Sequence, residues 1–297
     1  MFTVIIPNYN MGNYIRASIE SVLNQSYQNF ELIVIDNCST DQSWDQAIKC
    51  KDDRILFYKQ TANLGMYANL NVGIMLAKGK YIKIHCSDDI MHPQCLEVLE
   101  KGIHSIQTKS NVPIYFGHDM IVGEIGKEFP TNWINENITT DFVSKKTSLS
   151  EEVPTGLPLV CVDTNAFRDF GGFGSPDPQR DFSRDLLRLG LFANTCDCYK
   201  IDKPLIFERA HSGQSRFSMK KQWQLNEVYQ LFYSTGIINT TEGKNKLKVL
   251  AGYHLASSLK YIYVKMSFEY LIHTLNFSIK KGLFGVTYLK SFLLRIK

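Results

Sequence analysis

The stretch 3–10, TVIIPNYN, places a run of apolar residues directly before a polar cluster. Its first part, Thr3–Ile6, has the composition of a strand that is buried on both faces. The same arrangement recurs at 30–41, FELIVIDNCSTD, and at 81–89, YIKIHCSDD. We therefore predict two further strands, Phe30–Ile35 and Tyr81–His85, each followed by a polar loop.

Segments with helical periodicity separate these strands. Apolar residues recur at three- and four-residue spacing over 15–23, and Asn13 can cap that helix. The other elements predicted in this half are helices over Ser43–Lys51 and Tyr67–Ala77, a strand over Ile55–Tyr58, and a helix from Pro93 to about Ile106. This alternation implies an α/β fold in which a mostly parallel sheet carries helices on both faces.

The pattern is weaker in the remainder of the chain. We expect loops with a short strand or two over 117–155, and order returns with the apolar run Pro158–Val162. Asp163 can then cap a helix that ends at Gly171-Gly172, and a further helix covers roughly Asp181–Leu189. Beyond about residue 215 the pattern is helical. We therefore predict one domain over 1–215 and a helical C-terminal region over 216–297.

Composition narrows the class of protein. The 297 residues are 44% hydrophobic and carry a net charge of only +4, so no global charge favours nucleic acid as a partner. The 7 cysteines are scattered, which fits reduced thiols in the cytoplasm. Neither a signal peptide nor a transmembrane helix is expected. Segment 255–297 is basic and amphipathic, which suits either packing on the catalytic domain or binding to an anionic membrane surface.

The polar clusters fall where ligands bind in open α/β sheets, beyond the carboxyl ends of the strands. The adjacent carboxylates of Asp88 and Asp89 repel each other unless positive charge lies nearby. A divalent cation that bridges a diphosphate would relieve this repulsion. One of the two residues could instead cap the helix that opens near Pro93, and spacing alone favours neither interpretation.

Four other residues have a functional and a structural interpretation. Asp36 could contact a ribose or a base, or form an Asx turn. Tyr9 could stack on a base, or be an ordinary half-buried aromatic residue. Asp181 could act as a general base, or cap its helix. His211 could ligate a metal or touch phosphate, although a lone histidine is more often structural.

Taken together, these segments resemble the family-2 glycosyltransferases of the GT-A fold. The matching blocks, dense over residues 2–105, are Val4–Asn10, Ile19–Tyr27, Phe30–Asp41, Asn63–Gly65, Asn71–Gly73, Ala77–Ile82 and Ser87–Asp89, with weaker matches at Gly171–Phe173, Asp181 and Arg209–Gln214. The resemblance implies a nucleotide-sugar-binding half over 1–105 and an acceptor half over 106–215. It also implies an inverting transfer from a nucleotide-diphosphate sugar, expected to be a UDP-sugar, to an acceptor hydroxyl.

The resemblance also implies roles for individual residues. Tyr9 and Asp36 would contact the base and the ribose, and Asp88 would lie near the ribose. Asp89 would ligate Mg²⁺ or Mn²⁺, with His211 as a further candidate ligand, and Asp181 would be the catalytic base. The other residues assigned to nucleotide-sugar binding are Pro7, Asn10 and Asn63.

This chain departs from the family pattern at several positions. Cys86 stands where the fuller acidic motif has another Asp, and Arg180 stands where Glu commonly precedes the base. The helix after the base is offset by one residue, so Asp185 or Asp177 could be the base instead. Leu70 replaces an arginine that is often found in its helix.

The expected function is sugar transfer in the synthesis of cell-surface polysaccharide, capsule, lipopolysaccharide or lipid-linked oligosaccharide, at the inner face of the plasma membrane. The alternative is a catalytically inactive nucleotide-sugar-binding or scaffolding protein of the same fold, which Cys86 and Arg180 motivate. An NAD-dependent enzyme is disfavoured, because the first predicted strand is not followed by a glycine-rich turn.

Overall fold

The computed structural model describes residues 1–106, 112–123, 130–138, 143–146, 156–174 and 184–211. The chain forms two compact units, Met1–Gln214 and Ser215–Lys297. The second unit lies outside the described residues, so its predicted helical structure stays a prediction. Within the described part of the chain, none of the helices combines the length and the apolarity that a bilayer-spanning helix needs.

The described strands form one sheet in the order β3-β2-β1-β4-β8-β6-β9-β5, with β7 paired to β9. The strands are β1 (Phe2–Asn8), β2 (Phe30–Asp36), β3 (Ile55–Lys59), β4 (Tyr81–Ile84), β5 (Ile90–Met91), β6 (Ile114–Val122), β7 (Val143–Lys146), β8 (Val160–Asp163) and β9 (Asp197–Glu208). The helices are α1 (Ile15–Leu23), α2 (Ser43–Ala47), α3 (Met66–Leu76), α4 (Cys95–Ser105), α5 (Thr131–Ile134), the 3₁₀ turn η3 (Leu157–Leu159), α6 (Thr164–Asp169) and α7 (Arg184–Ala193).

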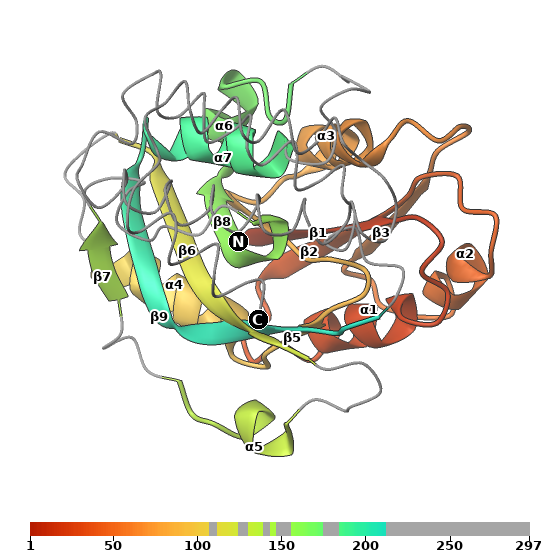
Figure 1. Ribbon diagram of the computed structural model, residues 1–297, viewed down its shortest axis with the longest axis horizontal. Helices are drawn as coiled ribbons and strands as arrows, with labels where there is room; N and C mark the ends of the chain where they lie inside the picture. Colours follow the sequence, from red (N-terminus) through yellow and green to blue (C-terminus); the bar gives the residue numbers. More distant parts are fainter. Residues whose placement is uncertain (107–111, 124–129, 139–142, 147–155, 175–183, 212–297) are drawn as a thin grey trace, which may run out of the picture. The chain divides into compact units, whose positions relative to one another are not determined.

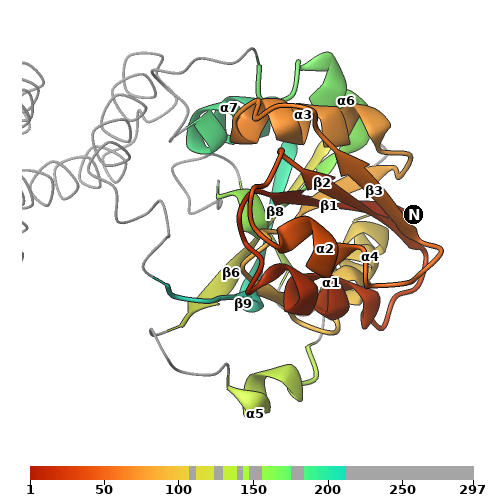
Figure 2. The same cartoon turned by 90° about the vertical axis from the view of Figure 1, so that its right-hand side faces the viewer.

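Helices cover both faces of this sheet, as the sequence predicts. Figures 1 and 2 show α3, α6 and α7 on one face and α1, α2 and α4 on the other. Alternate residues of β1 serve the two faces. Val4 and Ile6 pack in the cluster that includes residues of α1 and α4, whereas Ile5 packs in the cluster that includes residues of α3, α6 and α7. Because successive side chains of a strand point to opposite faces and both faces are covered, consecutive residues of this strand are apolar.

The first four strands are parallel, and the rest of the sheet is mixed. β1 pairs in parallel with both β2 and β4, and β2 pairs in parallel with β3. The next strand, β8, lies antiparallel between β4 and β6. The pattern of the sequence predicts the parallel half because each crossover there is a short periodic helix. It does not predict the antiparallel insertion of β8, which depends on pairing between distant segments.

Several predicted boundaries need correction. Asn13 does not cap α1: Tyr14 occupies the cap position without a side-chain cap bond, and the Asn13 amide oxygen accepts a hydrogen bond from Gln42 instead. The second helix ends at Ala47 rather than Lys51. The short strand β5 was not predicted, because a strand of two residues is too short to show an alternating pattern of apolar and polar residues. The predicted cap at Asp163 is confirmed, since its carboxylate accepts a hydrogen bond from the backbone of Ala166 at 3.0 Å.

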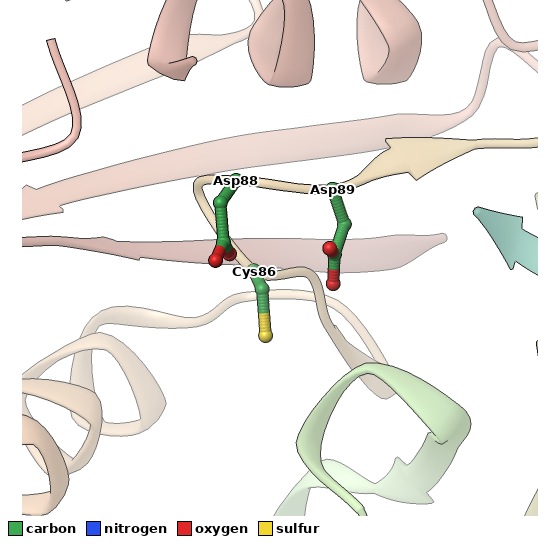
Figure 3. Close-up of side chains that lie close together, drawn as sticks. All are labelled: Cys86, Asp88 and Asp89. Carbon is green, nitrogen blue, oxygen red and sulfur yellow. The ribbon is translucent and has the colours of Figure 1, made fainter. Parts of the chain in front are cut away.

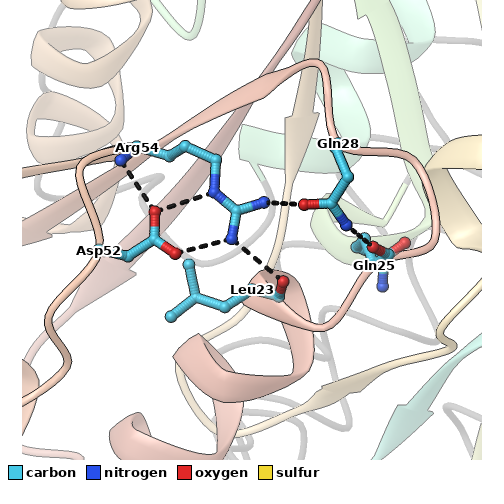
Figure 4. A network of polar contacts seen from close by, with 5 residues as sticks. All are labelled: Leu23, Gln25, Gln28, Asp52 and Arg54. Atoms are coloured by element: carbon cyan, nitrogen blue, oxygen red, sulfur yellow. Dashed lines mark hydrogen bonds and ion pairs between the residues drawn. The ribbon is translucent and has the colours of Figure 1, made fainter.

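A polar network joins the end of α1 to the start of β3 (Figure 4). The Arg54 guanidinium donates to both carboxylate oxygens of Asp52, at 2.8 and 2.7 Å, and to the carbonyl oxygen of Leu23 at 3.3 Å. It also donates to the amide oxygen of Gln28 at 2.7 Å, and it lies over the ring of Phe30. This network fastens the edge of the sheet that lies opposite the polar loops.

Candidate active site

The strand order reverses between β1 and β4, because the chain runs outward from β1 through β2 to β3 and then returns to the other side of β1. In open α/β sheets, the crevice beyond such a switch point is where ligands bind. The loops that follow β1, β2 and β4 meet at this edge, and Asn37 donates a backbone hydrogen bond to the carbonyl oxygen of Asn8 across it. The predicted polar clusters are therefore brought to one edge of the sheet.

Asp88 and Asp89 lie in the loop from β4 to β5, together with Cys86. One ligand atom from each of these three residues lies within 4.8 Å of the others. Figure 3 shows their side chains pointing to the same side of the loop. The backbone amide of Asp89 donates to the carbonyl oxygen of Cys86 at 3.2 Å, which closes the turn that brings the three residues together.

The electrostatics of this cluster favour a cation. Burial raises the pKa of Asp89 well above its usual range, and the nearby charges of Asp88 and Glu208 raise it further. Burial raises the pKa of the Cys86 thiol, and the charges of Asp89 and Asp88 raise it further. A divalent ion would offset this repulsion, and carboxylate oxygens are the ligands that Mg²⁺ and Mn²⁺ prefer. The residues present therefore fit the predicted metal, whose identity stays a prediction.

Two residues at the end of β9 complete the cluster. β5 and β9 are antiparallel with Ile90 opposite Phe207, so the chain beyond them brings Arg209 to Asp88. The Arg209 guanidinium donates to the carbonyl oxygen of Asp88, and its backbone amide lies 3.3 Å from an Asp89 carboxylate oxygen. His211 Nε2 lies 3.0 Å from Asp88 Oδ2. His211 therefore lies beside the carboxylate pair, and its predicted role as a metal ligand stays a prediction.

Tyr14 holds these two basic residues in place. The Arg209 guanidinium lies 5.1 Å from the centre of the Tyr14 ring and donates to the Tyr14 carbonyl oxygen at 3.0 Å. The His211 ring stacks on Tyr14 with centroids 4.7 Å apart. Sequence reasoning assigned no role to Arg209 or Tyr14. Arg209 belongs to the weakly matching block Arg209–Gln214, which could have indicated a role at the site. Nothing in the local sequence around Tyr14 indicates such a role.

The predicted nucleotide-binding residues lie in the loops after β1 and β2. Tyr9 is 42% exposed, so its ring is open to a stacking partner. Asp36 is buried, and its carboxylate accepts from the Asn8 amide at 2.7 Å and from the Ser39 backbone amide at 2.9 Å. In this geometry Asp36 braces the two loops against each other. Its predicted contact with a ribose stays a prediction.

The remaining predicted binding residues order these loops. Asn10 has a left-handed backbone, with a φ of 54°, and its side-chain oxygen accepts from the Thr40 backbone amide at 2.8 Å. Asn63 accepts from the Asn37 amide at 2.8 Å, which fixes the loop before α3. Pro7 is half-buried within β1. Their contacts with a nucleotide-sugar also stay predictions.

The candidate bases are only partly placed. Asp181, Asp177 and the preceding Arg180 lie outside the described residues. Asp185 lies in the first turn of α7, and its carboxylate accepts a hydrogen bond from the Tyr67 hydroxyl at 3.0 Å. Leu70, which replaces an arginine in the family pattern, is fully buried in the core under α3. Its side chain therefore serves packing and not phosphate binding.

The glycine turn that follows α6 is anchored to α3. The Asn71 side chain accepts from the Phe173 backbone amide at 3.0 Å and donates to the Gly174 carbonyl oxygen at 2.9 Å. Gly172 has a φ of 53°, and a Cβ there would lie 2.7 Å from the Asn71 side-chain oxygen. The weakly matching block 171–173 is thus tied to the strongly matching block that begins at Asn71.

Comparison with known proteins identifies relatives of this chain. The model of the family described as "Glycosyl transferase family 2" matches residues 3–156, just over half of the chain. Glycosyltransferase GlyG of Streptococcus pneumoniae is 34% identical over 121 residues, which cover 40% of this chain and 40% of GlyG. The Escherichia coli protein WfaP is 40% identical over 89 residues, 30% of this chain and 36% of WfaP. WfaP is described as a UDP-Glc:alpha-D-GlcNAc-diphosphoundecaprenol beta-1,3-glucosyltransferase.

The likeness extends to solved structures. S. aureus TarS 1–349, crystallised with UDP-GlcNAc, superposes with a TM-score of 0.68 at 18% identity, over 99% of this chain and 90% of that one. At this identity the likeness shows a shared fold. The alignments with the two curated relatives cover well under half of their length.

Proposed function

This chain belongs to family 2 of the glycosyltransferases and has the GT-A fold, and on that basis we propose that it transfers a sugar from a UDP-sugar to an acceptor hydroxyl, with inversion at the anomeric carbon. The proposed setting is the synthesis of cell-surface polysaccharide or lipid-linked oligosaccharide. The observation that carries the proposal is the cluster of Asp88, Asp89, Arg209 and His211 at the switch point of the sheet.

In the proposed complex, the diphosphate lies over this cluster and the base stacks on the exposed ring of Tyr9. Asp89 and Asp88 would hold Mg²⁺ or Mn²⁺, with His211 beside them, and the ion would neutralise charge on the departing diphosphate. Arg209 fixes the loop that carries both carboxylates, because its guanidinium bonds to the backbone of Asp88 and of Tyr14. A site built on such fixed groups loses little free energy to reorganisation when charge develops.

An inverting transfer also needs a base that takes the proton of the acceptor hydroxyl as the new bond to the anomeric carbon forms. We propose Asp181 for this role, with Asp185 and Asp177 as alternatives. The hydrogen bond from Tyr67 to Asp185 suits a residue that is fixed in position. Replacing Asp181 and Asp185 singly by Asn tests the assignment. Loss of turnover with donor binding retained identifies the base, and an unchanged rate in Asp181→Asn removes Asp181 from the role.

The names of relatives support the choice of donor and acceptor. TarS was crystallised with UDP-GlcNAc, and the name of WfaP includes UDP-Glc as donor and a diphosphoundecaprenol-linked sugar as acceptor. We therefore propose a uridine nucleotide donor and a saccharide or lipid-linked saccharide acceptor. A screen of donor hydrolysis across a panel of nucleotide-sugars would identify the donor.

Calorimetry with UDP and Mn²⁺ tests the proposed site directly. Asp89→Asn removes a buried carboxylate from the cluster, and we expect it to weaken UDP binding at least about tenfold in the presence of Mn²⁺. The matched control is Asp53→Asn, which removes the same charge from an exposed residue. Equal UDP affinity in both variants would contradict the proposed site. Mn²⁺-dependent UDP binding without turnover on any donor would favour the inactive, scaffolding alternative.

We also propose that segment 255–297 binds an anionic membrane surface, which would place the enzyme at the inner face of the plasma membrane. The proposal rests on its basic, amphipathic sequence, in which 7 lysines and arginines accompany the single acidic residue Glu269. Flotation with anionic liposomes should recover the full chain and not a chain truncated at 254. Equal recovery of both would instead favour packing of this segment on the protein.

A further inference from the structure

Cys86 differs in its surroundings from three other thiols of this protein. The thiols of Cys38, Cys196 and Cys198 donate hydrogen bonds to carbonyl oxygens. Among the described residues, the Cys86 thiol has no hydrogen-bond partner. Its sulfur instead faces the carboxylates of Asp88 and Asp89, within 4.8 Å of an oxygen of each. A half-buried thiol that faces two carboxylates, and no backbone acceptor, is placed for a cation.

The distances suit a single ion. Donor atoms around a tetrahedral ion lie about 3.4–3.6 Å apart when the metal–sulfur distance is about 2.3 Å and the metal–oxygen distance is about 2.1 Å. The three donor atoms lie within 4.8 Å of one another, which is at most about an ångström more than this geometry needs. Rotation of the three side chains about their χ angles is enough to close a difference of that size.

Sulfur changes which ion such a site prefers. Carboxylate oxygens alone suit Mg²⁺, which is hard and dehydrates reluctantly. A thiolate ligand raises the affinity for softer ions such as Zn²⁺ and Cd²⁺, and affinities generally increase from Mn²⁺ along the first transition row. The family pattern has an aspartate at this position, so the cysteine alters the chemistry of the site without altering its location.

We propose that Cys86 is a metal ligand, and that it makes this site prefer thiophilic divalent ions over Mg²⁺. The inference rests on the proposed function, since it assigns the identity of the ion at the donor site. The ion replaces the thiol proton, which passes to water, and binds the resulting thiolate together with Asp88 and Asp89.

Cadmium is a direct probe, because thiolate coordination gives a sulfur-to-cadmium charge-transfer band in the ultraviolet. The full chain should show this band on titration with Cd²⁺, and Cys86→Ser should lose it. Calorimetry should show Cd²⁺ affinity reduced about 10–100-fold in Cys86→Ser, with Mg²⁺ affinity changed far less. Cys86→Asp should also lose the band, and it should bind Mg²⁺ more tightly than the natural protein does.

The matched control is Cys196→Ser, because Cys196 and Cys198 form another pair of thiols that could bind Cd²⁺. The band should remain in this variant. A band that persists in Cys86→Ser and disappears in Cys196→Ser would overturn the proposal, as would the absence of any band in the natural protein.

The test also separates this inference from the proposed function. UDP binding that needs a divalent ion but shows no sulfur coordination would overturn the role of Cys86 and leave the glycosyltransferase proposal standing. A Cys86-dependent band in a protein that does not bind UDP would support the role of Cys86 as a metal ligand and contradict the proposed glycosyltransferase function.

Discussion

Replacement of Gly79 by alanine should destabilise the first unit without altering its site. An added Cβ would lie 2.5 Å from both the Phe2 carbonyl carbon and the Thr3 backbone nitrogen. Both neighbours are backbone atoms of β1, so the chain itself must move. The movement would also disturb the hydrogen bonds that join Gly79 to the hydroxyls of Thr3, at 2.8 Å, and Thr164, at 2.7 Å.

The magnitude follows from these contacts. Overpacking in a closely packed interior costs about 1–3 kcal/mol, and each weakened hydrogen bond adds about 0.5–1.5 kcal/mol. We expect Gly79→Ala to lower the free energy of unfolding by about 3 kcal/mol. For a chain of this size, that corresponds to a fall in Tm of about 6–12 °C. Thermal unfolding followed by circular dichroism measures it.

Two other glycines provide graded controls. At Gly73, an added Cβ would meet Ile35 Cδ1 at 2.6 Å and Ile5 Cγ2 at 2.8 Å, which are side-chain and not backbone atoms, so Gly73→Ala should cost less than Gly79→Ala, about 1–2 kcal/mol. At Gly156 the nearest atom is a Leu159 methyl at 3.4 Å, so Gly156→Ala should change stability by less than about 0.5 kcal/mol.

Gly79 precedes β4, at the edge of the sheet opposite the candidate site. The folded fraction of Gly79→Ala should therefore bind UDP with unchanged affinity. If the free energy of unfolding of Gly79→Ala lies within about 1 kcal/mol of that of the natural protein, or if Gly79→Ala unfolds at a temperature no lower than Gly156→Ala does, the close approach of β1 to residue 79 is refuted.

Two further predictions concern charged groups. The Arg54 guanidinium lowers the pKa of Asp52 to about 2, so the ion pair stabilises the folded state above about pH 4, and this contribution disappears as the pH falls through about 2. Because both side chains are about a quarter exposed, we expect the ion pair to contribute about 1 kcal/mol to the free energy of unfolding. In urea unfolding between pH 5 and pH 2, the stability of Arg54→Gln should depend less steeply on pH than that of the natural protein. Parallel curves for the two proteins would contradict this. Arg209→Lys keeps the charge but cannot bond to the carbonyl oxygens of both Asp88 and Tyr14. The affinity for UDP in the presence of Mn²⁺, measured by calorimetry, should therefore fall about tenfold. Unchanged affinity would show that the forked guanidinium of Arg209 is not needed.

Local patterns were sufficient to predict the parallel half of the sheet. The runs before Asn8, Asp36 and His85 are largely apolar because their side chains pack on both faces, and the helices between them have a clear period. Cap signals were less reliable, since Asp163 caps its helix and Asn13 does not. A polar side chain near a helix start has several partners available, and only the fold selects among them.

The sequence by itself determined the family, the parallel half of the sheet and the position of the carboxylate pair after its strand, because each is read from local patterns and motifs. Only the tertiary structure decided what surrounds that pair. Antiparallel pairing of β5 with β9 brings Arg209 and His211 to Asp88 from more than a hundred residues away in the chain. Both residues also contact Tyr14, which directly precedes α1. Such pairing depends on the register between distant strands, which no local period encodes. The same loop geometry turns the Cys86 thiol toward Asp88 and Asp89, and so gives a departure from the family pattern a chemical meaning.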